Sequence, residues 1–205
     1  MEVKLYTELA STINTLPTNE ISLERKRILG VLVEYLQLKQ NNSDPINLNF
    51  ICTHNSRRSQ FAQLWAQVAA EYYGIPANCF SGGVEETAFN ERAVAAIKRA
   101  GFKVASQGDS NPRYSVSIAD DTKPIIMFSK LYDDVSIPGS NFAAVMTCSD
   151  ADENCPYLPG AESRMQLLYD DPKEFDGTAE EAEKYDERAR QIAAELFFIF
   201  AQIIK

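Results

Sequence analysis

Histidine and cysteine are scarce in this sequence. The 205 residues include one histidine, His54, and four cysteines. A standard zinc site that contains histidine is not expected from a single histidine, although three of the cysteines together with His54 remain an unusual alternative ligand set. Because a chain of this length can bury a full core without disulfides, the cysteines are expected to be catalytic, metal-binding or buried thiols.

Long apolar runs and targeting signals are also missing. No run approaches the ~20 apolar residues that a membrane-spanning helix needs. The first residues, MEVKLYTELASTINTL, lack a basic region followed by an apolar block and a small-residue cleavage site. We therefore expect a cytoplasmic protein that does not insert into a membrane.

Positive charge is in deficit. The chain has 20 Lys and Arg against 29 Asp and Glu, a net charge of −9. This balance argues against a general nucleic-acid binder and against a polybasic membrane binder. The adjacent pair Arg57 and Arg58 is therefore a local exception on a surface that must be mostly acidic.

Strand patterns alternate with helix patterns, which predicts an α/β fold: an open, mainly parallel sheet with helices on both faces. Strands are expected at 46–51, 78–83, 142–147 and 164–169, and helices at 57–74, 89–101 and 178–204. Thr178 and Glu181 have the spacing of a capping box at the start of the last helix. Segments 113–118 and 124–130 flank a turn and predict an inserted β-hairpin.

Residues 1–45 are predicted to form an N-terminal helical extension to a main domain at 46–205. Two apolar periodicities indicate two helices, the second capped by Ser22. The extension is expected to cover the core, and mediating a homodimer or guarding the site are the alternatives.

The segment ICTHNSRRS, residues 51–59, places a thiol and two arginines between a strand and a helix. Free backbone N–H groups at a helix N-terminus favour an anion, and Arg58 can clamp two oxygens of an oxyanion. The same positive field stabilises a thiolate, which makes Cys52 a candidate nucleophile, and Ser59 can donate a hydrogen bond to it. Asn55 tolerates the left-handed backbone that a tight loop needs. The oxyanion-binding residues are predicted to be Thr53, His54, Asn55, Ser56, Arg57 and Arg58. A buried strand-end thiol beside a solvated helix start is the alternative.

A second cysteine-containing segment, CSDADENCP, follows the strand predicted at 142–147. The carboxyl ends of parallel strands share one edge, so Cys52, Cys148 and Asp171 are expected to serve one site. Cys155 comes seven residues after Cys148, ~10.5 Å along a helix, whereas a disulfide needs a Cα separation of ~4.4–6.8 Å. A disulfide between them would require this polar segment to loop out.

FICTHNSRRSQFAQLWA resembles the signature loop and first helix of the low-molecular-weight protein tyrosine phosphatase superfamily. By position, the resemblance implies that Cys52 is the nucleophile, Arg58 the oxyanion clamp and Ser59 the thiolate partner. The pair Asp171-Pro172 matches the family's Asp-Pro, whose aspartate is the general acid.

CSDADENCP is similar to the redox segment of thioredoxin-coupled arsenate reductases, a branch of that superfamily. The resemblance implies that Cys52 attacks arsenate, Cys148 attacks the adduct to release arsenite, and Cys155 then forms a disulfide with Cys148 that thioredoxin reduces. No tightly bound cofactor is implied. The likeness spans about residues 46–204.

Several positions depart from the family pattern, among them His54, which stands where many relatives have glycine and some have histidine. Arg57 replaces a cysteine commonly found before the loop arginine, and Gln63 replaces a glutamate that helps some reductases bind potassium alongside positions matching Asn55 and Ser81. Lys173 stands where Asp-Pro-Tyr phosphatases have tyrosine. Cys79, in a strand pattern, is expected to be a core thiol.

We therefore predict an arsenate reductase coupled to thioredoxin. The alternatives are a phosphatase acting on phosphotyrosine or a small phosphoester, and a non-enzymatic anion- or metal-binding regulator.

Overall fold

The computed structural model describes residues 4–154 and 157–204. At its centre is a parallel sheet of four strands in the order β2-β1-β6-β7. These strands are Ile46–Cys52 (β1), Ala77–Gly83 (β2), Phe142–Met146 (β6) and Ala161–Gln166 (β7). The predicted α/β class with a parallel sheet is confirmed.

Strand β1 is buried along its whole length, as expected for a central parallel strand covered on both faces. Successive side chains point to opposite faces, so Leu48 and Phe50 join the large core while Ile51 joins a smaller cluster. The smaller cluster also contains Cys52 and Cys148. The catalytic candidates therefore lie at the carboxyl edge of the sheet, beside this second cluster.

The large core forms between the sheet and the helices α3 (Arg58–Tyr73), α4 (Glu91–Arg99) and α6 (Glu181–Ala201). Trp65 on α3 packs edge-on against Phe102 and Phe197, with ring centroids 5.0 and 6.3 Å apart. Gly74 caps α3 in the left-handed conformation, φ 64°, where the sequence predicts the stop.

The other face of the sheet is covered by the short helix α5 (Ser149–Asn154) and by residues 131–141. Two asparagines of β1 hold these loop residues. Asn49 donates to the carbonyl of Tyr132 at 3.0 Å, and Asn47 donates to the carbonyl of Asn141 at 3.0 Å. The side-chain N–H groups of these two asparagines are thus satisfied by the backbone that covers them, whereas the Asn49 Oδ1 is buried without a hydrogen-bond partner among the described residues.

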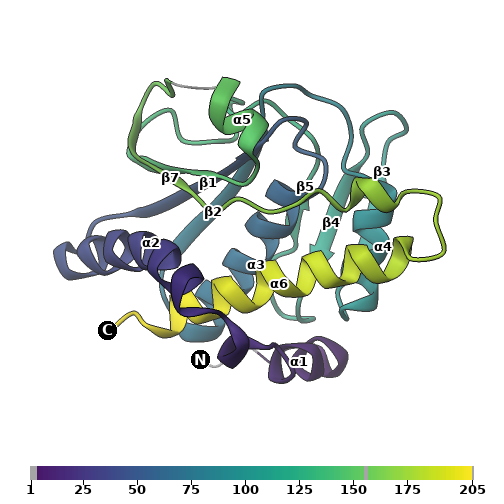
Figure 1. The fold of residues 1–205 in the computed structure, drawn as a ribbon, viewed down its shortest axis with the longest axis horizontal. Coiled ribbons are helices and arrows are strands. Elements are labelled where there is room, and N and C mark those ends of the chain that lie inside the picture. The colour runs from purple at the N-terminus through teal and green to yellow at the C-terminus, as the bar shows by residue number, and fades with distance from the viewer. Residues whose placement is uncertain (1–3, 155–156, 205) are drawn as a thin grey trace.

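The N-terminal segment forms α1 (Thr7–Asn14), the 3-10 turn η1 (Thr18–Glu20) and α2 (Leu23–Asn42). The predicted cap is confirmed, because the Ser22 hydroxyl accepts from the backbone N–H of Arg25 at 3.1 Å. Leu9 and Leu32 belong to the same core as the sheet. In Figure 1 this segment lies along α6, and both chain termini are found on that side of the molecule.

The inserted region is a three-stranded antiparallel sheet: Lys103–Gln107 (β3), Arg113–Ser117 (β4) and Ile125–Met127 (β5). The predicted hairpin corresponds to β4 and β5, but β3 was not predicted. Its residues are mostly exposed, so the apolar alternation that signals a strand is missing.

Two local predictions need correction. Strand β7 begins at Ala161 and ends at Gln166, earlier than the predicted 164–169. The capping box of the last helix is wrong, because α6 begins at Glu181, whose carboxylate accepts from the N–H of Gly177 at 2.6 Å. Thr178 instead belongs to the turn between the 3-10 helix η2 (Pro172–Phe175) and α6.

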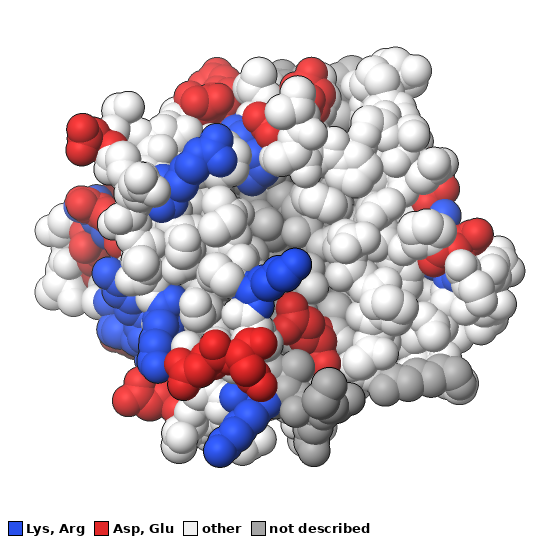
Figure 2. Space-filling model, turned by 180° about the vertical axis from the view of Figure 1, so that it is seen from behind, with Lys and Arg blue, Asp and Glu red and all other residues white. Residues whose placement is uncertain are grey.

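The face opposite to that of Figure 1 carries basic and acidic side chains intermixed toward one side and is largely uncharged elsewhere (Figure 2). Over the part of the chain that the structure describes, no helix combines the length and apolar composition needed to span a bilayer.

Candidate active site

The loop between β1 and α3 has the backbone expected of an anion cradle. Cys52 ends β1, Arg58 begins α3, and Asn55 between them has the predicted left-handed conformation, φ 46°. Within the described residues, no hydrogen bond uses the backbone N–H groups of residues 54–58 as donors. These groups remain available for an anion at the helix N-terminus.

Gly83 allows the loop to approach the end of β2. A Cβ atom built there would lie 2.7 Å from the Asn55 nitrogen and 2.8 Å from the Thr53 oxygen. Both contacts are with backbone, which cannot turn aside as a flexible side chain can. The observed shape of the loop therefore requires glycine at this position.

A network of buried polar groups surrounds the Cys52 sulfur, which belongs to a residue that is 4% exposed. The Ser59 hydroxyl lies 3.0 Å from it, and Ser59 accepts from the Asn55 amide at 2.9 Å. With its lone pairs directed at the amide, Ser59 is oriented to donate its proton to the sulfur. A hydroxyl so placed stabilises a thiolate both as nucleophile and as leaving group.

Asp171 holds the loop arginine in the free protein. Arg58 Nη2 donates to the Asp171 carboxylate at 2.8 Å, and Nη1 donates to the carbonyl of Tyr169 at 3.0 Å. The Nε of Arg58 is buried without a hydrogen-bond partner among the described residues. Arg57 also binds Asp171, through Nε at 2.8 Å and Nη2 at 3.4 Å.

The charge state of Asp171 follows from these contacts. Burial alone raises the pKa of Asp171, but the charges of Arg58 and Arg57 and their hydrogen bonds outweigh it, so the pKa lies below its ordinary value. Asp171 is therefore a carboxylate in the free protein at neutral pH.

The cavity between these groups measures about 10 Å³ and is lined by Cys52, His54, Ser56, Arg57, Arg58 and Asp171. Such a volume holds about one water molecule, less than a tetrahedral oxyanion needs. An oxyanion and the Asp171 carboxylate would compete for the Arg58 guanidinium.

Three of the predicted oxyanion-binding side chains have other partners. The Ser56 hydroxyl donates to the carbonyl of Ala88 at 2.7 Å, and Thr53 donates to the Asp150 carboxylate at 2.6 Å. His54 faces Glu85, with 3.3 Å between Nε2 and the carboxylate. In this arrangement these residues offer an anion their backbone N–H groups, whereas the side-chain donors come from the arginines.

Cys148 lies next to the loop, as the shared sheet edge predicts. Cys148 is 1% exposed, and its sulfur lies 3.5 Å from the hydroxyl of Thr53, the residue that follows Cys52. The backbone N–H of Ala151 in α5 points to the same sulfur at 3.4 Å. The predicted partner of Cys148, Cys155, lies outside the described residues.

The inserted region supports the loop, which the sequence did not indicate. Ser129, just after β5, donates to the carbonyl of His54 at 2.9 Å, and the N–H of Lys130 donates to the Asn55 side chain at 3.0 Å. Gln60 of α3 links both parts, donating to the carbonyl of Asn55 at 2.9 Å and to that of Phe128 at 2.8 Å. No sequence signal identifies these residues, because their contacts arise from tertiary packing.

Other candidate ligands lie apart from this site or are already bonded. Cys79 is packed in the large core, and burial raises the pKa of its thiol well above the ordinary value. The Ser81 hydroxyl donates a hydrogen bond to the Gln63 side chain at 2.6 Å. Two of the side chains considered for a potassium site are therefore bonded to each other. In residues 4–154 and 157–204, no three His, Cys, Asp or Glu side chains cluster as a metal site would require.

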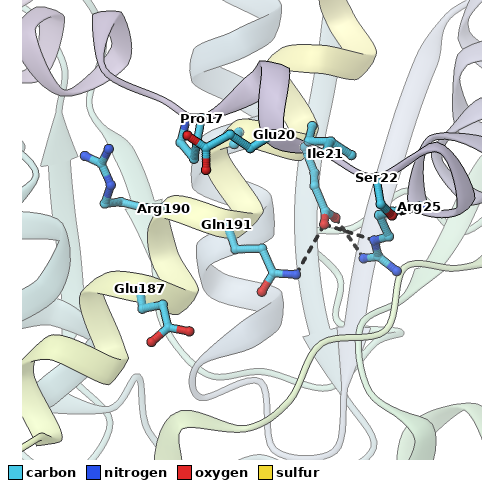
Figure 3. Close-up of a pocket in the computed structure, with 10 residues that line it drawn as sticks. Pro17, Glu20, Ile21, Ser22, Arg25, Glu187, Arg190 and Gln191 are labelled. Carbon is cyan, nitrogen blue, oxygen red and sulfur yellow. Dashed lines mark hydrogen bonds and ion pairs between the residues drawn. The ribbon is translucent and has the colours of Figure 1, made fainter.

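A larger cavity, about 500 Å³, lies between the N-terminal segment and α6 (Figure 3). Arg25 forms two hydrogen bonds, 2.9 and 2.8 Å, to the Glu195 carboxylate, which Gln191 also approaches at 3.3 Å. None of the predicted site residues lines this cavity. Arg25, Gln191 and Glu195 are paired with one another there, whereas Arg190 donates to the carbonyl of Thr15 and Glu187 pairs with Lys184, outside the cavity lining.

Comparisons with known proteins agree with this geometry. Over 153 residues the chain is 31% identical to an arsenate reductase of Bacillus licheniformis, covering 75% of this chain and 93% of that protein. It is 32% identical over 141 residues to an arsenate reductase of Bacillus subtilis, covering 69% and 84%. A comparison with protein-family models finds no match.

Solved structures show the same fold. A YwlE mutant from Bacillus subtilis aligns with a TM-score of 0.52 and 15% identity, covering 77% of this chain and 97% of that one. A low-molecular-weight protein tyrosine phosphatase from T. tengcongensis also aligns with a TM-score of 0.52 and 15% identity, covering 77% and 99%.

Proposed function

This chain belongs to the arsenate reductase family within the low-molecular-weight protein tyrosine phosphatase superfamily, and we propose that it reduces arsenate to arsenite through a relay of three cysteines. One observation carries the proposal. A buried second thiol, Cys148, lies beside the oxyanion loop, 3.5 Å from the hydroxyl of Thr53. Hydrolysis of a phosphoester uses one nucleophilic cysteine and has no need of this thiol.

In the first step, the Cys52 thiolate attacks the arsenic of arsenate in the loop. A sulfur–arsenic bond forms and an arsenic–oxygen bond breaks, and the departing oxygen leaves as water after taking up protons. Arg58 and the backbone N–H groups of residues 54–58 hold the remaining oxygens. Ser59, 3.0 Å from the sulfur, stabilises Cys52 as the thiolate.

In the second step, the Cys148 thiolate attacks the Cys52 sulfur of the adduct. A disulfide forms, the sulfur–arsenic bond breaks, and its electron pair remains on arsenic, which leaves as arsenite. Two thiols are oxidised and As(V) is reduced to As(III), so the electrons balance. The N–H of Ala151 lies 3.4 Å from the Cys148 sulfur and donates to it.

The third step regenerates the nucleophile. Cys155 attacks the Cys148 sulfur, releasing the Cys52 thiolate and leaving a Cys148–Cys155 disulfide. An external dithiol protein, which we propose to be thioredoxin, reduces this disulfide by thiol–disulfide exchange. No tightly bound cofactor takes part in this scheme.

The test measures NADPH consumption with arsenate, thioredoxin and thioredoxin reductase. We expect arsenate-dependent turnover in wild type and none in Cys148→Ser. Cys155→Ser should release a single equivalent of arsenite per chain, because its relay stops at the Cys52–Cys148 disulfide. Cys79→Ser is the matched control and should turn over like wild type. Multiple turnovers in Cys148→Ser, or no arsenite from the fully reduced wild type, would exclude the relay.

A phosphatase activity is the second candidate, because Cys52, Arg58, Ser59 and Asp171 converge on one site. An aryl phosphate would be attacked by Cys52 and its leaving oxygen would need a proton. This activity should persist in Cys148→Ser, which separates it from arsenate reduction.

A further inference from the structure

Helix α2 is apolar on two sides. Its inner side contributes three fully buried leucines to the large core. Its outer side carries Ile28, Val31 and Leu38, which are 41, 52 and 59% exposed. A helix on the surface of a monomer usually turns polar and charged side chains to solvent. The outer side of α2, at the periphery of the fold in Figure 1, departs from this pattern.

The exposed apolar side chains form one stripe along α2. Val31 follows Ile28 by three residues and precedes Leu38 by seven, a spacing that keeps side chains on one side of a helix. Leu23, 78% exposed, adjoins the stripe at the N-terminal end of α2. Among the described residues, four of the ten large hydrophobic side chains that are exposed thus lie on this helix. Such a concentration of apolar surface on one element is typical of a site that binds another molecule.

Two charged residues on the same side of α2 have no partner within the chain. Arg27 and Glu34 are exposed, and across the described residues neither forms a salt bridge or a side-chain hydrogen bond. They are seven residues apart, close to two full turns, so they share one face and are separated by ~10.5 Å along the helix axis. One face of α2 therefore presents a positive and a negative charge to whatever molecule covers it.

The positions of these residues are symmetric about one point. Arg27 and Glu34 are centred between residues 30 and 31, and Leu23 and Leu38 have the same centre. If a second α2 lies antiparallel on the first, with a two-fold axis at this centre, Arg27 faces Glu34 of the partner subunit. Leu23 then faces Leu38 of the partner subunit, and Val31 lies beside the axis. The symmetry makes each of these contacts occur twice.

We propose that the outer face of α2 is the interface of a homodimer, in which two copies of this helix pack antiparallel and Arg27 of each chain pairs with Glu34 of the other. The occupant of the apolar stripe is thus a second copy of this chain. The proposal concerns assembly, so it does not depend on the reaction at Cys52.

The size of this face indicates a dimer that dissociates on dilution. Helix α2 has 20 residues, a length of ~30 Å at 1.5 Å per residue. Stable interfaces bury about 1,200–2,000 Å² in total, and a contact that follows one pair of helices is narrow. We therefore expect monomer and dimer to be in equilibrium at concentrations that can be measured.

The charges of this face argue against an anionic membrane as its occupant. Helices that lie on anionic lipids carry mainly Lys and Arg beside their apolar side. The outer side of α2 instead exposes Glu24, Arg27 and Glu34, on a chain whose net charge is −9. A second copy supplies both signs of charge at the positions where they are needed.

Sedimentation equilibrium over a range of concentrations tests the proposal, with dithiothreitol present so that intermolecular disulfides do not contribute. We expect wild type to dimerise reversibly. Arg27→Glu and Glu34→Arg should each raise the dissociation constant about tenfold or more, because the symmetry brings like charges together twice. The double variant Arg27→Glu/Glu34→Arg restores opposite charges and should dimerise within about threefold of wild type.

Two further measurements separate this pairing from a general effect of charge. An equimolar mixture of Arg27→Glu and Glu34→Arg should form a dimer that neither variant forms alone, because each chain then meets charges of the opposite sign. Lys123→Glu is the matched control: Lys123 is exposed in the inserted region, and its reversal changes the net charge as Arg27→Glu does. This control should leave the dissociation constant within about threefold of wild type.

Several results would overturn the proposal. Wild type that stays monomeric up to about 100 µM would do so, and if that monomer sediments with anionic vesicles the face belongs to a membrane. A dimer that both single reversals leave intact, or one that Lys123→Glu weakens as much as Arg27→Glu does, would exclude the pairing of Arg27 with Glu34. Recovery of the dimer in the double variant shows that the single variants lose it by repulsion and not by misfolding.

Discussion

The Ser59 hydroxyl lies 3.0 Å from the Cys52 sulfur and accepts a hydrogen bond from Asn55. Ser59→Ala should lower kcat/KM for arsenate about tenfold, because it removes a donor to the thiolate and leaves a buried amide without an acceptor. Ser56→Ala is the control, since that hydroxyl bonds to Ala88 and not to Cys52. Equal losses in the two variants would show that the effect comes from the loop as a whole.

Gly83→Ala should distort the oxyanion loop. The added methyl would meet backbone atoms of Glu85, Asn55 and Thr53 at 2.6–2.8 Å. We expect a loss of about 2–3 kcal/mol in the free energy of unfolding and a loss of arsenate turnover. Gly30→Ala is the matched control, because nothing lies within 4 Å of a methyl added there. This substitution within α2 should raise the free energy of unfolding by about 0.5–1 kcal/mol. Urea denaturation of both variants measures this, and a harmless Gly83→Ala would contradict the close approach.

Cys79 should be chemically silent in the folded protein. It is buried, and burial raises the pKa of its thiol, so little thiolate is present at neutral pH. Peptide mapping after iodoacetamide treatment should find Cys79 modified only when urea is present, and Cys79→Ala should keep the wild-type kcat. Modification of Cys79 in the native protein at a rate like that of Cys52 would contradict its place in the core.

The Arg25–Glu195 pair should hold the N-terminal segment to α6. Glu195 is 3% exposed, so Arg25→Met leaves a buried charge without its main partner. We expect a loss of about 3 kcal/mol in the free energy of unfolding, much of it recovered in Arg25→Met/Glu195→Leu. Glu187→Gln, which breaks an exposed pair with Lys184, should change the free energy of unfolding far less. A double variant no more stable than Arg25→Met would argue against a penalty from the unpaired charge.

Asp171 should give the protein a stability that disappears in acid. Its folded pKa lies below the ordinary value of 3.8, so the carboxylate stabilises the folded state above that pH. The advantage of wild type over Asp171→Asn should therefore be complete at neutral pH and shrink as the pH falls below 3.8, toward the folded pKa. Asp170→Asn is the matched control, because the side chain of Asp170 is 91% exposed. Urea denaturation across this pH range measures both, and a pH-independent difference would contradict the ion pairs.

Much of the fold could be predicted because its signals are local. The apolar run of β1, the cap at Ser22 and the stop at Gly74 each depend on a few neighbouring residues. Strand β3 lacks such a signal, since its mostly exposed residues are ordered by pairing with β4. The capping box failed because Glu181 bonds to Gly177.

The candidate site likewise combines features that the sequence predicts with features that depend on tertiary contacts. The juxtaposition of Cys52, Cys148 and Asp171 follows from strand order, and Asn55 has the backbone that the loop requires. The support from Ser129 could not be predicted, because it is contributed by an insertion 75 positions from His54. The double contact of Asp171 with Arg57 and Arg58 also required coordinates, since Asp171 is more than 110 positions away from both arginines in the sequence.

The pairing of Arg25 with Glu195 has a consequence for the newly made chain. The two residues are separated by 170 positions, which at about 5–20 residues per second amounts to roughly 9–34 s of synthesis. During that interval the apolar face of α2 has been made while the helix that will cover it has not. Residues 23–42 are thus a stretch of the nascent protein that would benefit from shielding by a chaperone, and release of the chain before α6 is complete would leave them without one of the elements they pack against.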